Sequence, residues 1–588
     1  RAFGRIGSGR LAAMRGSLRR GAFSVARRGI ALATALIVVL AAACSLLVDT
    51  DASQCASDSD CAAIHVGSRC EQGVCVHDDA GVSEAGAIAC AFTHDCAALA
   101  PSVCDPAQKV CVALQSPECP TILGDSTSDD AIVFGAIVPS PIDAPPGYLA
   151  DLSRTGDALS AGLALAVSDF ASSQNPTHAL PPRPGSEAPR PMVFVVCSDQ
   201  HSAAATARAA VHLAIDLRVP AILGTAFSSL TEVVASTLTA RAPGATLLLA
   251  PRSAALGAAD NGGLVARVAP ADDAEGAAIS ALVADRAPSI AASVVAGDGG
   301  PPSLRVAVVY KDDSYGRAVL AAMRSTLRFN GTDVAGNGTN YREVSYGDPD
   351  KPGYSAQLAS AALGVFNERP HIVIAIGTNE QVTGIVSQLE ANWSAAEFRP
   401  YYFMSGGLAV PELWGYLASN DPTDSIRKRI VGTMPTRGGA TYDAFASALG
   451  DQFPAAAPIV WGAAEYYDGA YLLGFSVAAI GDQDVTGATL NAGFALLGSS
   501  DGALQPKVGP SSIAETFAKL TAGEGVSLTG ASNLLTFDAT KRALTGGVTQ
   551  VWCVPSVAGR AGAAILSGQS IDTATSAVKG TVSIACGL

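Results

Sequence analysis

From about residue 130 onward, short apolar runs rich in β-branched residues alternate with longer segments of helical periodicity. AIVFGAIV and PMVFVVCSD have the composition of strands buried on both faces, and DALSAGLALAVSDF between them has apolar residues at helical spacing. The alternation continues through LRVAVVYKDD, YGRAVLAAMRSTLRF and PHIVIAIG. It predicts an α/β fold with parallel sheets covered by helices on both faces. Ligands of such sheets bind at the carboxyl ends of the strands, so the loops there are the candidate site.

The N-terminal segment has the order of an export signal. Residues 1–43 hold eight Arg and no acidic residue, and an uncharged apolar run of about fifteen residues ends at Ala43. That run is shorter than the roughly 20 residues a membrane-spanning helix needs, which favours a signal peptide. Three alanines directly before Cys44 resemble a bacterial lipoprotein signal, in which the cysteine is lipidated. The alternatives are ordinary cleavage near Ala43 or a retained span.

The expected location is therefore the periplasm, with the protein anchored to a membrane through Cys44. Ser45 follows the cysteine where Asp would favour retention at the inner membrane, so the outer membrane is slightly favoured. Removal of residues 1–43 leaves 30 basic and 52 acidic residues, a net charge of −22, compared with −14 for the whole chain. Such an acidic chain is a poor partner for nucleic acid, and we expect none.

Residues 44–120 are predicted to form a separate cysteine-rich module with a linker. Two similar blocks each carry four cysteines: Cys55, Cys61, Cys70 and Cys75, then Cys90, Cys96, Cys104 and Cys111. So short a segment buries little apolar surface, so disulfides must stabilise it, in a connectivity that the sequence leaves open. Zinc is the alternative, but no C-x2-C pair occurs.

Four further cysteines lie outside the two blocks. Cys553 and Cys586 each end a strand-like segment near the C-terminus, and we expect them to pair. Cys119 and Cys197 then remain, and neighbouring parallel strands could bring them within bonding distance.

Three motifs in order, DDSYGRAV, YYDGAYLL and GASNLLTFD, resemble the type I periplasmic solute-binding proteins, in their branched-chain amino-acid receptor-like branch. The resemblance covers roughly residues 130–555. It implies two Rossmann-like lobes joined by three crossovers, a small-molecule ligand in the cleft between them, and an ABC permease as a possible partner. The segments it predicts are lobe 1 at 121–270, lobe 2 at 271–405, lobe 1 again at 406–535, and lobe 2 with a C-terminal segment at 536–588.

The loops of the predicted first lobe supply most of the candidate ligand-binding residues. Ser228 and Ser229 in GTAFSSL open a helix after a strand, where hydroxyls and free backbone N–H groups would face a carboxylate, or where one serine serves as the N-cap. In APRSAAL, Ser253 stands one step before the position where the resembled family has a threonine. Arg252 beside it is either a solvated rim charge or a bidentate partner for an anion.

The remaining candidates are Tyr315, Tyr148 and Glu380. The resemblance places Tyr315 on the second lobe and Tyr148 on the first, where two aromatic rings would cover a small ligand. Glu380, in GTNE, lies where the family presents an acid to an ammonium group. Each of the three could instead pack within its own loop or face solvent.

The sequence contains none of the common catalytic signatures. It has no H-E-x-x-H, no G-x-S-x-G and no G-x-x-x-x-G-K-[ST], so we expect neither an enzyme nor a bound metal or cofactor. The expected function is a lipid-anchored solute-binding protein that clamps an amino acid or a related carboxylate or amide, for ABC-type uptake or sensing. The alternative is an outer-membrane lipoprotein of the same fold that regulates, for example, cell-wall enzymes. A cleft lined by Ser228, Ser253 and Tyr315 would favour the receptor, and one filled by bulky side chains the regulator.

Overall fold

The computed structural model describes residues 68–71, 74–77 and 88–586, the last range with gaps at 100, 106, 140–147, 173, 176, 184, 253–260, 270–271, 295–302, 348–352, 394–397, 436–437, 457–461, 499–504, 538–543, 545–547 and 574. The predicted signal peptide 1–43, Cys44, Cys55 and Cys61 lie outside these residues. The chain divides into two compact units, Arg1–Ala87 and Ile88–Leu588. Within the described residues, no helix is both long enough and apolar enough to cross a bilayer.

In the first unit, the described residues form one antiparallel hairpin. It pairs β1 (Ser68–Glu71) with β2 (Val74–His77) and sets Cys70 opposite Cys75.

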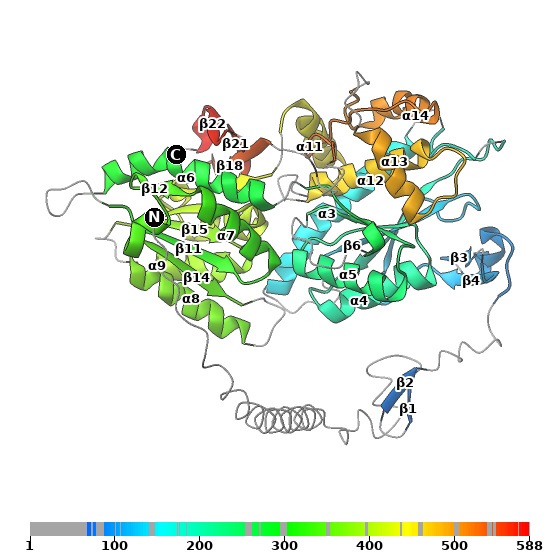
Figure 1. Ribbon diagram of the computed structural model, residues 1–588, viewed down its shortest axis with the longest axis horizontal. Coiled ribbons are helices and arrows are strands. Elements are labelled where there is room, and N and C mark those ends of the chain that lie inside the picture. Colours follow the sequence, from blue (N-terminus) through cyan, green and yellow to red (C-terminus); the bar gives the residue numbers. More distant parts are fainter. Residues whose placement is uncertain are drawn as a thin grey trace, which may run out of the picture. The chain divides into compact units, whose positions relative to one another are not determined.

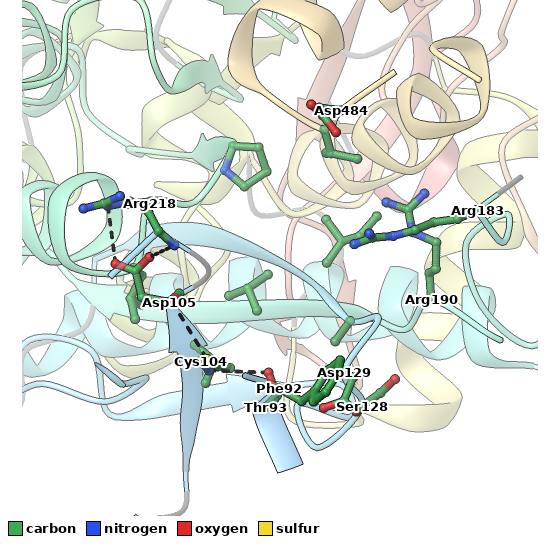
Figure 2. Close-up of a pocket in the computed structure, with 18 of the residues that line it drawn as sticks. Phe92, Thr93, Cys104, Asp105, Ser128, Asp129, Arg183, Arg190, Arg218 and Asp484 are labelled. Carbon is green, nitrogen blue, oxygen red and sulfur yellow. Dashed lines mark hydrogen bonds and ion pairs between the residues drawn. The ribbon is translucent and has the colours of Figure 1, made fainter. Parts of the chain in front are cut away.

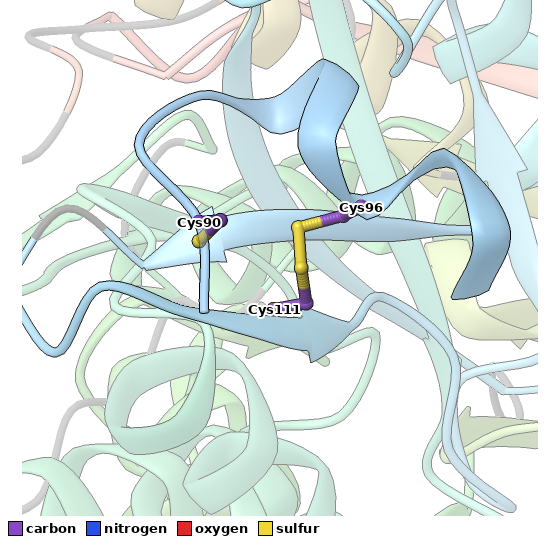
Figure 3. Close-up of side chains that lie close together, drawn as sticks. All are labelled: Cys90, Cys96 and Cys111. Atoms are coloured by element: carbon purple, nitrogen blue, oxygen red, sulfur yellow. A yellow bond between two sulfur atoms is a disulfide. The ribbon is translucent and has the colours of Figure 1, made fainter. Parts of the chain in front are cut away.

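The second cysteine block has the same kind of hairpin at the start of the larger unit. β3 (Ser102–Asp105) pairs with β4 (Val110–Ala113), after the 3-10 helix η1 (Thr93–Leu99). Disulfides join Cys90 to Cys104 and Cys96 to Cys111. Figure 3 shows Cys90 beside the Cys96–Cys111 bond. Three of these sulfur atoms lie within 4.8 Å of one another, but a sulfur in a disulfide is not the thiolate that zinc binds.

Lobe 1 is built on a six-stranded sheet (Figure 1). In spatial order its strands are β10 (Val265–Arg267), β9 (Leu247–Ala250), β8 (Ala221–Leu223), β6 (Ile132–Val138), β7 (Met192–Ser198) and β5 (Thr121–Leu123). All neighbours are parallel except β5, which runs antiparallel to β7. Side chains alternate between the faces, so Phe194 and Val196 of β7 enter one core while Val195 and Cys197 enter the other.

Helices cover both faces of this sheet, as the alternation predicts. One face packs against α4 (Ala203–Val211), which continues as the π-helix η2 (His212–Asp216), and against α5 (Ser228–Arg241). The other face packs against α3 (Tyr148–Ala171) and α12 (Ala463–Ala479), whose residues from Ala463 to Ala478 are all buried. Three more helices join the same core: α11 (Ala440–Gln452), α13 (Gly487–Leu497) and α14 (Ile513–Thr521).

Lobe 2 is built on an eight-stranded sheet. In spatial order its strands are β14 (Tyr341–Tyr346), β11 (Val306–Lys311), β15 (Ile372–Ile376), β16 (Tyr401–Met404), β17 (Ile430–Met434), β18 (Val548–Cys553), β21 (Ile565–Asp572) and β22 (Ala577–Gly580). The strands from β14 to β17 are parallel, and β18, β21 and β22 extend the sheet in antiparallel pairs. The helices of this lobe are α6 (Asp272–Ser293), α7 (Ser314–Thr326), α8 (Tyr354–Glu368), α9 (Ser387–Asn392) and α10 (Pro411–Asn420).

The chain passes between the lobes three times: after β10, after β17 and before β18. The predicted return to lobe 1 at residue 406 is too early, because β17 pairs with β16 and packs Ile430, Val431 and Met434 into the core of lobe 2. This short strand, interrupted by a glycine, is not distinguished by the sequence pattern.

Disulfides join Cys119 to Cys197 and Cys553 to Cys586, the two pairs expected from the sequence. The strands beside the first pair are antiparallel, however, since Thr121 of β5 lies opposite Val196 of β7. The parallel arrangement assumed for this pair is therefore wrong, because strand direction cannot be read from an apolar run.

Candidate functional site

The loops at the carboxyl ends of strands in both sheets meet around one small cavity. Lobe 1 contributes Ala226, Phe227 and Ser228 after β8, and Arg252 after β9. Lobe 2 contributes Lys311 at the end of β11, Asp313 and Tyr315 after it, Thr378 after β15, and Gly407 after β16. In parallel sheets that are covered by helices on both faces, ligands bind at the carboxyl ends of the strands, which is where this cavity lies.

Two cations from opposite lobes approach the same aromatic ring. The guanidinium carbon of Arg252 lies 5.9 Å from the centre of the Phe227 ring, and Lys311 Nζ lies 5.4 Å from it. Such distances permit cation–π attraction. Lys311 also pairs with Asp313, at 3.1 Å between Nζ and Oδ2, and both side chains are buried. His201 packs edge-on against Phe227 at 5.0 Å, and burial together with the charge of Lys311 lowers its pKa to about 3.

Buried carboxyl groups surround these cations. Glu275 of α6 accepts hydrogen bonds from the Tyr315 hydroxyl at 2.9 Å and from the Gly406 amide at 2.7 Å. Burial nevertheless raises the pKa of Glu275 to about 7, and that of Glu465, in the first turn of α12, to about 8. Protonation of these carboxyl groups reduces the negative charge that acts on Arg252.

Glycines make room for the charged groups. Gly462 precedes α12 at φ +110°, and a Cβ there would lie 2.4 Å from Cδ of Arg252. Gly316 lies in the first turn of α7, where a Cβ would lie 1.9 Å from the carbonyl oxygen of Lys311. The motif DDSYGR therefore needs its glycine because the helix starts directly against the end of β11.

The cavity holds only about 20 Å³. That is enough for about one water molecule and too little for an amino acid or an aromatic acid. Phe227, Arg252, Lys311 and Tyr315 fill the space around it, so the described lobes are closed on each other here.

The structure brings three of the predicted residues to this cavity and leaves others elsewhere. Ser228, Arg252 and Tyr315 line it, and Arg252 is 5% exposed rather than a solvated rim charge. Ser229 is half-buried and does not line the cavity. Neither serine is the N-cap of α5, a position taken by Phe227.

The other candidates give a mixed outcome. Glu380 is buried within lobe 2, where its carboxylate accepts hydrogen bonds from the Tyr346 hydroxyl at 2.5 Å and from the Thr378 amide at 3.1 Å. Glu380 does not line the cavity, and its partners are groups of lobe 2, whereas the sequence predicted that it would contact an ammonium group of the ligand. Ser253 and the side chain of Tyr148, the first residue of α3, lie outside the described residues.

Sequence reasoning missed Phe227, Lys311, Glu275 and Glu465. Lys311 directly precedes the motif DDSYGR, of which Asp313 is the second residue, and a lysine that ends a buried strand was an available signal. Asp313 does cap α7, accepting from the Gly316 amide at 2.8 Å, as its place before the helix suggests. Glu275 and Glu465 lie inside helical segments, where only the tertiary fold shows that they are buried near Arg252.

No family model and no curated protein matches the sequence. Solved structures do match. One is a solute-binding protein of an ABC transporter from Rhodopseudomonas palustris BisB5 in complex with 3,4-dihydroxybenzoic acid, at 14% identity and a TM-score of 0.50, covering 76% of this chain and 98% of that one. Another, from R. palustris, in complex with 4-hydroxybenzoate, has 13% identity and a TM-score of 0.51, covering 74% and 97%. A third, from strain HaA2 with p-hydroxybenzoic acid, has 13% identity and a TM-score of 0.50, covering 74% and 97%.

These likenesses establish the fold. The chain has the two-lobed α/β architecture of the type I periplasmic solute-binding proteins, the family that its motifs resemble. The predicted fold class is therefore confirmed, with the cysteine-rich block added in front of lobe 1.

Proposed function

We propose that the protein is an exported solute-binding protein whose two lobes close over a small carboxylate. The observation that carries this proposal is the convergence of Arg252 and Lys311, from opposite lobes, within 6 Å of the Phe227 ring. Each cation lies at the end of a strand, where closure of the lobes would bring it to a ligand held on the opposite lobe.

The charges at the cavity favour an anion. Asp313 offsets Lys311, whereas the raised pKa values of Glu275 and Glu465 leave Arg252 only partly neutralised near pH 7. A carboxylate would restore the balance, and arginine binds it in a bidentate geometry.

An aromatic ring beside two cations suits an aromatic carboxylate in particular. Benzoate derivatives occupy the solved structures of the same fold, which supports this choice over an aliphatic amino acid. Because the cavity now holds about 20 Å³, the lobes must open, and Phe227 or Tyr315 must turn aside, before such a ligand can enter.

Calorimetric titration with benzoate, 4-hydroxybenzoate, leucine, acetate and neutral benzamide tests the proposal. We expect a benzoate to bind best and benzamide not to bind. Arg252→Gln should weaken binding about ten- to a hundredfold, since it removes a charged hydrogen-bond partner. Arg241→Gln is the matched control, because Arg241 is exposed at the far end of α5, about 20 Å from the cavity, and should change nothing. Equal binding by Arg252→Gln and Arg241→Gln would contradict this placement of the ligand.

The proposal includes an anchor and a partner. Lipidation of Cys44 would hold the receptor at a membrane, with the outer membrane slightly favoured, and delivery to an ABC permease or a sensor would use the closed lobes. In a Gram-negative host the full-length protein should incorporate labelled fatty acid, and Cys44→Ser should abolish the label. A protein found only in the soluble periplasmic fraction would count against the anchor.

A second candidate function is a protein-interaction regulator of the same fold. The bulky side chains of Phe227, Arg252, Lys311 and Tyr315, which fill the cavity, favour it. Small-angle X-ray scattering separates the two functions: a receptor should open without ligand and contract with it. A chain that stays closed with every solute tested would support the regulator.

A further inference from the structure

A second cavity, of about 740 Å³, lies where the second cysteine block meets lobe 1 (Figure 2). Its wall includes Ile132, the first residue of β6, and Pro220, directly before β8. The cavity between the lobes lies beyond the opposite ends of these strands. Since the seven residues of β6 span about 20 Å, the two cavities are separate sites.

One buried arginine on this wall makes no hydrogen bond through its guanidinium within the described residues, although the carboxylate of Asp130 acts on its charge. Arg190 is 7% exposed, and none of the hydrogen bonds within the described residues involves its guanidinium, whose Nε is fully buried. Figure 2 shows Arg183 and Arg190 side by side on the wall. Burial, and then the charge of Arg183, lower the pKa of Arg190, while Asp130 acts in the opposite direction. A buried donor without a partner costs free energy that an incoming anion would recover.

The other charged groups of the cavity are already paired or lie apart from the arginines. Arg218 forms an ion pair with buried Asp105 at 3.5 Å, and Asp129 accepts from His94 at 2.6 Å. Asp484 lies on the loop before α13, apart from Arg183 and Arg190 in Figure 2. Arg183 forms an ion pair with Asp130 at 3.6 Å, so Arg190 is the arginine of this wall that is left to bind an anion.

Apolar side chains complete the cavity. Leu217 and Val485 line it, and the ring of Phe92 is 55% exposed at its edge. The volume is within the range of about 300–1,000 Å³ that small-molecule sites occupy.

The geometry points to a second binding site, centred on Arg190, for a small molecule that carries a carboxylate or phosphate group beside an apolar part. The guanidinium binds either oxyanion through two parallel hydrogen bonds. The site goes beyond the proposed function, because it uses neither the cavity between the lobes nor their closure.

Calorimetry in an Arg252→Gln background tests this site with the other cavity impaired. The probes are benzoate and phenyl phosphate, with acetate and inorganic phosphate as their counterparts without a ring. We expect one of the aromatic probes to bind more tightly than its counterpart, and the preferred probe identifies the oxyanion. Adding Arg190→Gln should weaken that binding at least tenfold, whereas adding Arg241→Gln should leave it unchanged. If none of the four probes binds, or if Arg190→Gln binds as tightly as the control, the site does not exist.

Two further experiments, a surface substitution and a crystal soak, test the site without the buried Arg190→Gln substitution, so their outcome does not depend on whether that variant folds. Arg183 is exposed beside Arg190, so Arg183→Glu should keep the fold and weaken binding at least tenfold by repelling the anion. In crystals soaked with 4-bromobenzoate, anomalous scattering should place bromine in the cavity and the carboxylate on Arg190. Binding at crystal concentration only, without a calorimetric signal, would overturn the proposal. A failure here leaves the ligand affinity attributed to Arg252 unaffected, so the two proposals fail separately.

Discussion

The second cysteine block and lobe 1 lie next to each other in the chain but are stabilised differently. In the block from Ile88 to Ala113, the buried residues are chiefly cysteines and polar groups, and two disulfides close loops of 14 and 15 residues. In lobe 1 every residue of β7 is buried, and apolar cores cover both faces of the sheet. The block therefore depends on covalent bonds that restrict its unfolded state, and the lobe on the burial of apolar surface.

The boundary between the two regions uses both kinds of interaction. The Cys119–Cys197 disulfide ties the segment after the block to β7. Beside it, Glu118 pairs with Arg208 of α4 at 2.6 Å, and its carbonyl accepts from the Ser198 amide at 2.6 Å. The Cys119–Cys197 disulfide closes a loop of 78 residues, which is far longer than the loops that the two disulfides of the block close.

The largest expected effect comes from this long loop. Replacing Cys119 and Cys197 by alanine should lower the free energy of unfolding of lobe 1 by about 4–5 kcal/mol, because the loop entropy removed from the unfolded state grows with loop length. Denaturant-dependent hydrogen exchange at β6 and β7 measures it. An unchanged midpoint would mean that apolar burial alone holds this edge of the sheet.

A smaller and more local effect is expected in the block. The double variant Cys96→Ala, Cys111→Ala should cost about 3 kcal/mol within the block while the unfolding midpoint of the lobes stays the same. Hydrogen exchange at β3 and β4 reports on the block, and fluorescence on the lobes. Loss of the lobes in this variant would show that the two regions are one cooperative unit.

The next effect is a pH dependence of the free energy of unfolding of the lobes. The folded pKa of Glu275, about 7, lies above its unfolded value of 4.5, so its stabilising contribution is complete below pH 4.5 and is lost as the pH rises through 7. His201, whose pKa falls from 6.5 to about 3, lowers stability as the pH falls below 6.5, so the two groups overlap between pH 4.5 and 6.5 and the difference between variant and wild type isolates Glu275. Glu275→Gln should remove about 3 kcal/mol of this pH dependence.

Urea titrations of the wild type and Glu275→Gln between pH 4.5 and 8.5 measure that difference. Glu187→Gln, at an exposed position, is the control and should keep the wild-type slope. Parallel slopes for all three proteins would show that Glu275 does not titrate in this window.

The smallest effect is expected from Tyr315→Phe. It removes the hydrogen bond to Glu275 and should cost about 1 kcal/mol at neutral pH. Because that hydrogen bond lowers the pKa of Glu275, its loss should move the pH-dependent step upward. A step that moves downward would contradict the donor role of the Tyr315 hydroxyl.

The sequence predicts the lobes well because their strands are continuous apolar runs separated by amphipathic helices. It also predicts Ser228, Arg252 and Tyr315, because each directly follows a strand or opens a helix at the edge where ligands bind. It cannot predict the direction of β5 or of the strands from β18 onward, since an apolar run has the same pattern in either direction. Glu275 and Glu465 are acidic residues within helices, and only the tertiary fold buries them close enough to act on the charge of Arg252.

The burial of α12 sets the order in which the molecule can become stable as it is made. The strands of lobe 1 are complete at Arg267, yet the core on one of their faces needs Ala463–Ala479, about 200 residues later in the chain. At roughly 5–20 residues per second, a ribosome takes about 10–40 s to cover that distance. Throughout that time α3 is the helix available to cover this face of the first sheet, and all of lobe 2 up to β17 is synthesised before lobe 1 can close. Lobe 1 therefore becomes stable only after α12 has been made, late in the synthesis of the chain.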